Sequence, residues 1–158
     1  MKILLLTVSH TLFLAIGFAL GVYFLPILIA ERGPTAAEVA AVTSAPAAQR
    51  FEANLKRDLR GSDTFHWGEG KVTVTSNAVT HEGKLAPGPD YKLYLAPEFV
   101  DDEAAFLRIK QQSLRVGEIK SYDGFIVKLP PGTDVTRYKA VVIWCERFGE
   151  FISAASYR

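Results

Sequence analysis

Cysteine is almost absent from this sequence, because Cys145 is the only one in 158 residues. A single cysteine excludes an intrachain disulfide framework and a zinc site built from cysteines alone. The three histidines add little material for a metal cluster. An excess of charge is also missing: the formal net charge is +1, so there is no reason to expect a nucleic-acid partner. No nucleophile elbow and no complete phosphate-binding loop occurs, so nothing indicates a hydrolase.

Charge is missing altogether from residues 3–30, in which His10 is the only ionisable side chain. About 20 apolar residues suffice to cross a bilayer as a helix, whereas the apolar core of a cleaved signal peptide usually spans about 7–15. We therefore predict that residues 1–32 form an uncleaved signal anchor whose residues 3–30 lie in the lipid bilayer. A long signal peptide removed near Ala30, or within the Ala-rich stretch that follows, is the alternative.

The few charges beside this apolar run favour one orientation. Lys2 precedes the run, while Glu31 and Arg32 follow it and nearly cancel. Basic residues tend to remain in the cytoplasm. The prediction is a single-pass protein with a cytoplasmic N-terminus and an extracytoplasmic C-terminal domain.

The segment after the apolar run is rich in Ala, Pro, Ser and Thr. Residues 33–48 contain no aromatic side chain and cannot bury much surface, which predicts a flexible linker with at most a short helical turn. Residues 49–59 then place Phe51, Leu55 and Leu59 at a spacing of four. That spacing favours a short helix, with a first strand as the alternative.

From Gly61 onward, short alternating segments are separated by turn signals such as the Pro-Gly-Pro-Asp of residues 87–90. This pattern predicts an all-β domain, a Greek-key-like sandwich or barrel. A charged stretch, residues 101–112, interrupts the series as a loop with a helical turn. The predicted strands are 71–75, 79–85, 91–95, 114–120, 125–129, 140–145 and 150–155.

Two motifs carry a family resemblance. The Gly88-Pro-Asp-Tyr-Lys-Leu-Tyr-Leu95 segment and the Val-Val-Ile-Trp-Cys ending at Cys145, with Phe65-His-Trp-Gly-Glu-Gly-Lys-Val72 upstream, resemble the DM13 domain. The resemblance covers residues 57–158, and we place the domain at 49–158. It implies a β-rich extracytoplasmic module that takes part in electron transfer or oxidative modification. The signature cysteine of the family, which corresponds to Cys145, would act as a bare thiol or by holding a group such as haem. The chain has no cytochrome domain of its own, so its electron partner would be a separate redox or envelope protein.

The residues themselves leave two interpretations of Cys145 open. Alternation places Cys145 on one face of its strand with Val141 and Ile143, opposite Val142 and Trp144. If that face is the core, Cys145 is a buried and unreactive small hydrophobe. An unpaired thiol in an oxidising compartment can instead be a redox group or a ligand.

His81 and His66 are the weak candidate partners of Cys145 for cofactor binding. A thiolate and an imidazole form one of the axial pairs that haem accepts, but no haem-attachment motif occurs. A structural histidine is the plainer interpretation of each. Two functions therefore stand beside each other: an extracytoplasmic redox accessory centred on Cys145, and a non-catalytic interaction or structural module in which Cys145 is only packed.

Overall fold

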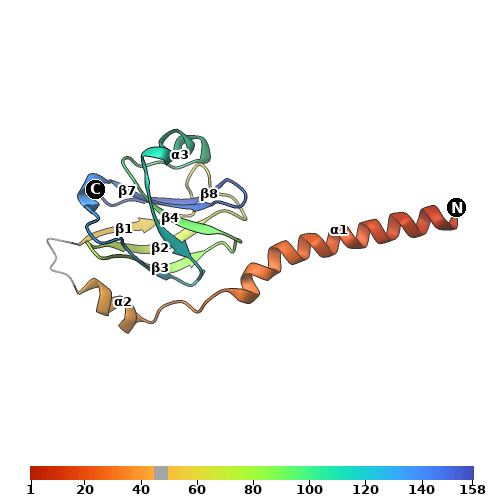
Figure 1. Cartoon of the computed structure of the whole chain (residues 1–158), viewed down its shortest axis with the longest axis horizontal. Helices are drawn as coiled ribbons and strands as arrows, with labels where there is room; N and C mark the ends of the chain where they lie inside the picture. Colours follow the sequence, from red (N-terminus) through yellow and green to blue (C-terminus); the bar gives the residue numbers. More distant parts are fainter. Residues whose placement is uncertain (45–49) are drawn as a thin grey trace.

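A single long helix leads into a β-rich domain in the computed structural model, which describes residues 1–44 and 50–158 (Figure 1). The helix α1 (Lys2–Ile29) is long and apolar enough to span a membrane, and nearly all its side chains are exposed. The short helix α2 (Ala36–Thr43) follows. The domain then contains eight strands: β1 (Phe51–Leu55), β2 (Gly68–Val74), β3 (Ala78–Leu85), β4 (Tyr91–Ala96), β5 (Leu114–Ile119), β6 (Phe125–Lys128), β7 (Ala140–Cys145) and β8 (Glu150–Ser156).

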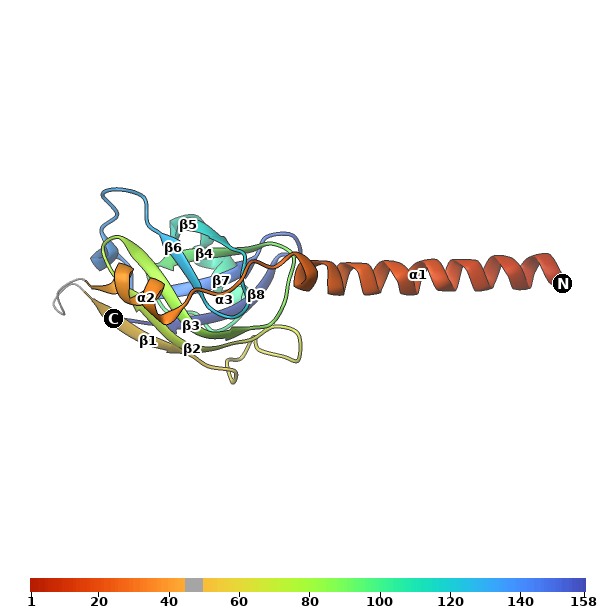
Figure 2. The same cartoon turned by 90° about the horizontal axis from the view of Figure 1, so that it is seen from below.

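The strands form two antiparallel four-stranded sheets, which confirms the predicted fold class. One sheet has the order β1-β2-β3-β6 and the other β5-β4-β7-β8. Strand β1 contacts β8, and β5 contacts β6, so the sheets approach each other along both edges (Figure 2). The chain therefore builds a β-sandwich that is nearly closed at its sides.

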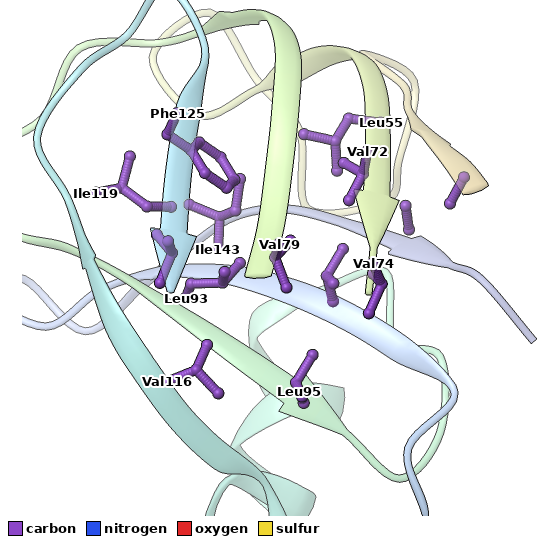
Figure 3. Packing of buried hydrophobic residues seen from close by; sticks show 14 of the residues in the cluster. Leu55, Val72, Val74, Val79, Leu93, Leu95, Val116, Ile119, Phe125 and Ile143 are labelled. Atoms are coloured by element: carbon purple, nitrogen blue, oxygen red, sulfur yellow. The ribbon is translucent and has the colours of Figure 1, made fainter. Parts of the chain in front are cut away.

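Alternating apolar residues fill the space between the sheets (Figure 3). Val72 and Val79 point inward from the first sheet, and Leu93 and Ile143 meet them from the second; all four are fully buried. Removing a large apolar side chain from water is worth about 1.5–3 kcal/mol. This core is the main reason why the predicted strand faces hold in the structure.

The second sheet is covered on its outer face as well. Helix α3 (Glu103–Ile109), extended by a 3-10 turn over Lys110–Gln112, lies between β4 and β5 in the sequence. It packs Phe106 against Trp144, with ring centroids 5.1 Å apart. As a result, every residue of β4 and β7 is buried.

Seven of the eight strands lie where alternation predicts them; over residues 49–59 the favoured short helix is wrong, and the alternative, a first strand, is what forms. Residues Phe51–Leu55 form β1, which pairs with β2 along its whole length. A spacing of four places Phe51 and Leu55 on one face of a strand as well as of a helix. Leu59 packs against the other cluster, under α3, so the three residues do not share one face.

The residues between α1 and the end of α2 run along the domain. The backbone N–H of Glu31 donates to the carbonyl of Lys120 at 2.9 Å. Thr35 and Glu38 form a capping box at the start of α2, which lies against β3 and buries Val39. The described part of the linker thus contains two helical turns rather than one, while residues 45–48 and the predicted domain start at Gln49 lie outside the described residues.

Candidate functional site

Cys145 is the last residue of β7 and faces the core between the sheets. It belongs to the same buried cluster as Val141 and Ile143, whereas Val142 and Trp144 belong to the cluster under α3. The predicted alternation is therefore confirmed. The cysteine is a free thiol with only 2% of its surface exposed.

The turn that follows β7 wraps around this sulfur. Burial raises the pKa of the Cys145 thiol, while hydrogen bonding from the backbone of Phe148, Arg147 and Asp90 acts in the opposite direction and only partly offsets it. The turn is closed by Gly149, whose N–H donates to the Cys145 carbonyl at 2.9 Å and whose φ of 71° suits glycine. The net effect keeps the sulfur protonated at neutral pH.

Two tyrosines flank the thiol. Tyr91 lies opposite Cys145 in the β4–β7 ladder, and directly opposed residues on one face have Cβ atoms about 5 Å apart. The ring of Tyr122 meets that of Tyr91 edge-on at 5.9 Å, and its hydroxyl donates to the Gly88 carbonyl at 2.6 Å. Burial raises the pKa of both phenols, and the neighbouring Cys145 raises them further. We call these three residues the Cys145 cluster.

The tyrosines of the Cys145 cluster were not among the residues singled out from the sequence as site residues. Tyr91 lies in the Gly-Pro-Asp-Tyr motif and on the inward face of its strand, so its core position could be read from alternation. Its pairing with Cys145 depends on the register of two strands about fifty residues apart. Tyr122 lies in a loop and gives no periodic signal.

A cavity of about 1040 Å³ lies beside the cluster, between the sandwich and the last turns of α1. Tyr91 and Tyr122 line it, together with Arg147 and Phe148 from the turn after Cys145. Cys145 itself lies behind these side chains. A partner or small molecule in the cavity would therefore reach the sulfur through Tyr91 or the turn.

Charged groups hold both sides of the site in place. Lys92 bridges Asp90 at 2.7 Å and Glu118 at 2.6 Å, which fixes the loop before β4. Glu146, the residue after Cys145, accepts hydrogen bonds from Tyr94 and from Lys110 at 2.7 Å. Burial opposes ionisation of Glu146, but these two donors outweigh it and lower its pKa. The carboxylate therefore anchors the turn to the helical layer.

The two candidate histidines have other partners. His81 is fully buried, its Nε2 donates to the Glu69 carbonyl at 2.9 Å, and its ring packs on Phe125. Its Nδ1 has no partner among the described residues, and burial lowers its pKa, so the ring is neutral. His66 lies in the loop before β2, with its Nδ1 2.9 Å from Asp63.

Neither histidine lines the cavity beside Cys145, and no hydrogen bond within the described residues joins an imidazole to the thiol. This arrangement does not fit a haem held between Cys145 and a histidine. No group of three or more metal-ligating side chains is found in residues 1–44 and 50–158 either. Cofactor binding by Cys145, His81 or His66 stays a prediction.

Comparison with known proteins gives one match. A family model described as electron transfer DM13 matches residues 39–157, most of the chain, starting inside α2 and including the whole Cys145 cluster. No curated protein and no solved structure matches the chain.

Proposed function

Because the chain belongs to the electron transfer DM13 family, we propose that it is a membrane-anchored accessory in electron transfer, with Cys145 as its redox group. The helix α1 would be the anchor, and the domain would lie on the extracytoplasmic side. The observation that carries the proposal is the Cys145 cluster: the single thiol of the chain is packed against two tyrosines beside a cavity. A separate protein would be the electron partner.

The surroundings of the sulfur suit one-electron chemistry better than exchange with another thiol. Thiol–disulfide exchange needs a thiolate that a second sulfur can reach, and Cys145 is both buried and protonated. Loss of one electron instead converts the thiol to a thiyl radical and releases its proton. The electron would pass to a one-electron acceptor on the partner, and the proton to water in the cavity.

Tyr91 would be the relay between the sulfur and the partner. It is opposite Cys145 in the ladder and, although nearly buried, it lines the cavity, which Cys145 does not; an acceptor docked there would therefore reach Tyr91 before the sulfur. If the acceptor takes an electron from Tyr91 and the phenol loses its proton, the phenoxyl radical can take the hydrogen atom of the Cys145 thiol. The phenol is then restored and the radical rests on sulfur.

The test is the rate at which the full-length protein, in lipid nanodiscs, reduces a one-electron oxidant such as hexachloroiridate. Cys145→Ala should lower the rate severalfold, and Tyr91→Phe should lower it as well. Tyr138→Phe is the matched control, since Tyr138 packs against the core outside the cluster. A Cys145→Ala protein that reacts at the wild-type rate would contradict the redox role.

A second function, an interaction or structural module of the envelope, is supported by the burial of Cys145. A cysteine with 2% exposure and a raised pKa behaves as a small hydrophobe. In that case the thiol reacts only when the domain unfolds, and Cys145→Ala leaves oxidant reduction unchanged while lowering stability. The same set of variants therefore separates the two functions.

A further inference from the structure

We propose that the end of the sandwich from which α1 emerges is seated in the headgroup region of the bilayer, with Phe65 and Phe148 inserted among phospholipids. We define the membrane-facing rim as the loops 62–67, 87–90, 120–123 and 146–149. This proposal rests on membrane anchoring through α1 and is independent of redox chemistry at Cys145.

Exposed apolar side chains point to the rim. After α1, four large hydrophobic side chains are exposed among the described residues: Phe65, Phe99, Leu107 and Phe148. Phe65 and Phe148, the two most exposed at 61% and 58%, belong to the rim. Singly exposed apolar residues need no explanation, but two phenylalanines beside a membrane helix form a continuous apolar surface with it.

Both phenylalanines lie beside α1. The ring of Phe65 meets that of Tyr23 edge-on, with centroids 6.4 Å apart. Phe148 lines the cavity together with Val22 and Leu25 of the helix. Both views show α1 leaving the sandwich at one end (Figures 1 and 2). The rim is thus continuous with the surface that enters the membrane.

The length of α1 sets the depth of this surface. Its 28 residues extend about 42 Å at ~1.5 Å per residue, whereas the hydrocarbon core is about 30 Å thick. A helix that enters the core at Lys2 leaves it after about 20 residues, close to Tyr23. Tyrosine and tryptophan are enriched at this level of membrane proteins, so Tyr23 suits it, and Phe65 lies at the same level because its ring meets that of Tyr23.

The rest of α1 supports the same depth. Leu28 and Ile29 are apolar, and the domain leaves 79% and 70% of their surfaces exposed. If the rim stood clear of the membrane, these side chains would face water. Seating the rim among lipids covers them together with Phe65 and Phe148.

One cationic group at the rim can bind a phospholipid phosphate. Arg147 lines the cavity opposite α1, its side chain is exposed, and it takes part in no ion pair found among residues 1–44 and 50–158. The other charged residues of the cavity pair with one another, Asp90 and Glu118 with Lys92, and Glu31 with Lys120. A guanidinium binds phosphate through paired N–H donors. The cavity thus presents an apolar wall from α1 and the guanidinium of Arg147 to a lipid with a phosphate headgroup.

The experiment places an environment-sensitive fluorophore at single cysteines in the full-length protein. Phe65→Cys, Phe148→Cys and Phe99→Cys are made in a Cys145→Ala background, labelled with NBD and reconstituted in phosphatidylcholine vesicles. Phe99 is the matched control. It follows Ala96, the end of β4 that is farther from the rim. Leu14→Cys, within α1, reports membrane anchoring itself. Separate vesicle preparations contain lipids that carry a nitroxide quencher, either near the headgroup or deep in the acyl chain.

We expect nitroxides near the headgroup to quench the probes at residues 65 and 148 severalfold more than the probe at residue 99. The deep nitroxide should quench the probe at residue 14. If the probe at residue 14 is quenched while those at 65 and 148 behave like the one at 99, the rim proposal is wrong and anchoring stands. If none is quenched, anchoring fails as well.

Two further measurements test whether the substitutions or the label, rather than the membrane, cause the quenching. In the unlabelled wild-type protein, Trp67 lies in the same loop as Phe65, so brominated lipids should reduce tryptophan fluorescence. A water-soluble maleimide should react slowly with the cysteines at 65 and 148. Protection from maleimide without lipid quenching would overturn the proposal, because a second copy or another protein would then cover the rim.

Discussion

Tyr91 and Cys145 face each other across the β4–β7 ladder, one at the start of its strand and the other at the end. Each has 2% of its surface exposed, and burial raises the pKa of both. The chain therefore holds a phenol and a thiol side by side on neighbouring strands, both protonated at neutral pH, near the loops closest to α1. This pair is the centre of the proposed redox site.

The raised pKa of Cys145 predicts a loss of stability in alkaline solution. An unfolded thiol ionises near pH 8.5, whereas the folded thiol keeps its proton to higher pH. Between about pH 8.5 and the ionisation of tyrosines near pH 10, the unfolded state binds fewer protons, so the free energy of unfolding falls as pH rises. Urea unfolding of the full-length protein in detergent, followed by tryptophan fluorescence, measures this slope. Cys145→Ala should flatten it, and an unchanged slope would show that the thiol is not its source.

His81 predicts a loss of stability in acid. Burial lowers the pKa of its imidazole below the ordinary value of 6.5, so the unfolded state binds a proton first as pH falls. The free energy of unfolding therefore decreases below about pH 6.5. His81→Gln, which keeps an N–H donor for the Glu69 carbonyl, should weaken this part of the pH dependence. His66→Gln is the control, since its side chain binds Asp63 in a loop, and it should leave the curve nearly unchanged.

Gly83 predicts a steric requirement where β3 passes close to β2. A Cβ at this position would lie 2.0 Å from the carbonyl oxygen of Glu69 and 2.7 Å from Cα of Gly70, and it would also lie 2.8 Å from Nε2 of His81. Gly83→Ala should lower the free energy of unfolding by more than about 2 kcal/mol. Gly132→Ala meets no atom within 4 Å and is strained only by its φ of 80°, so it should cost about 1 kcal/mol. Equal losses in the two variants would mean that the close approach of β2 to Gly83 does not determine the cost of the substitution.

The orientation of the chain can be tested in intact cells. We expect a cysteine placed by Pro131→Cys, in the turn 130–134, to react with a membrane-impermeant maleimide from outside in a Cys145→Ala background. Permeabilising the cells should not increase the labelling. Because Lys2 supplies the basic-residue bias, Lys2→Glu should lower the labelled fraction. Labelling that requires permeabilisation would reverse the proposed orientation.

Local patterns predicted much of the fold. Alternation gave the inward faces of β2, β3, β4 and β7, including the position of Cys145, because a strand with one buried face must repeat every two residues. The apolar run gave α1, and Pro, Gly and Asp marked the turns. The motifs around Gly88 and Cys145 indicated the family that the family model then matched.

Local sequence patterns were enough for the long apolar helix, the all-β class, the strand faces and the family. Other features depended on contacts between distant parts of the chain. Pairing with β2 made Phe51–Leu55 a strand, since a spacing of four fits both periods and only a partner strand selects one. The register of β4 on β7 brought Tyr91 to Cys145, and the path of α1 past the rim made a cavity beside them. Contacts between residues far apart in the sequence leave no local periodic signal, so the site could only be found once the sheets were assembled.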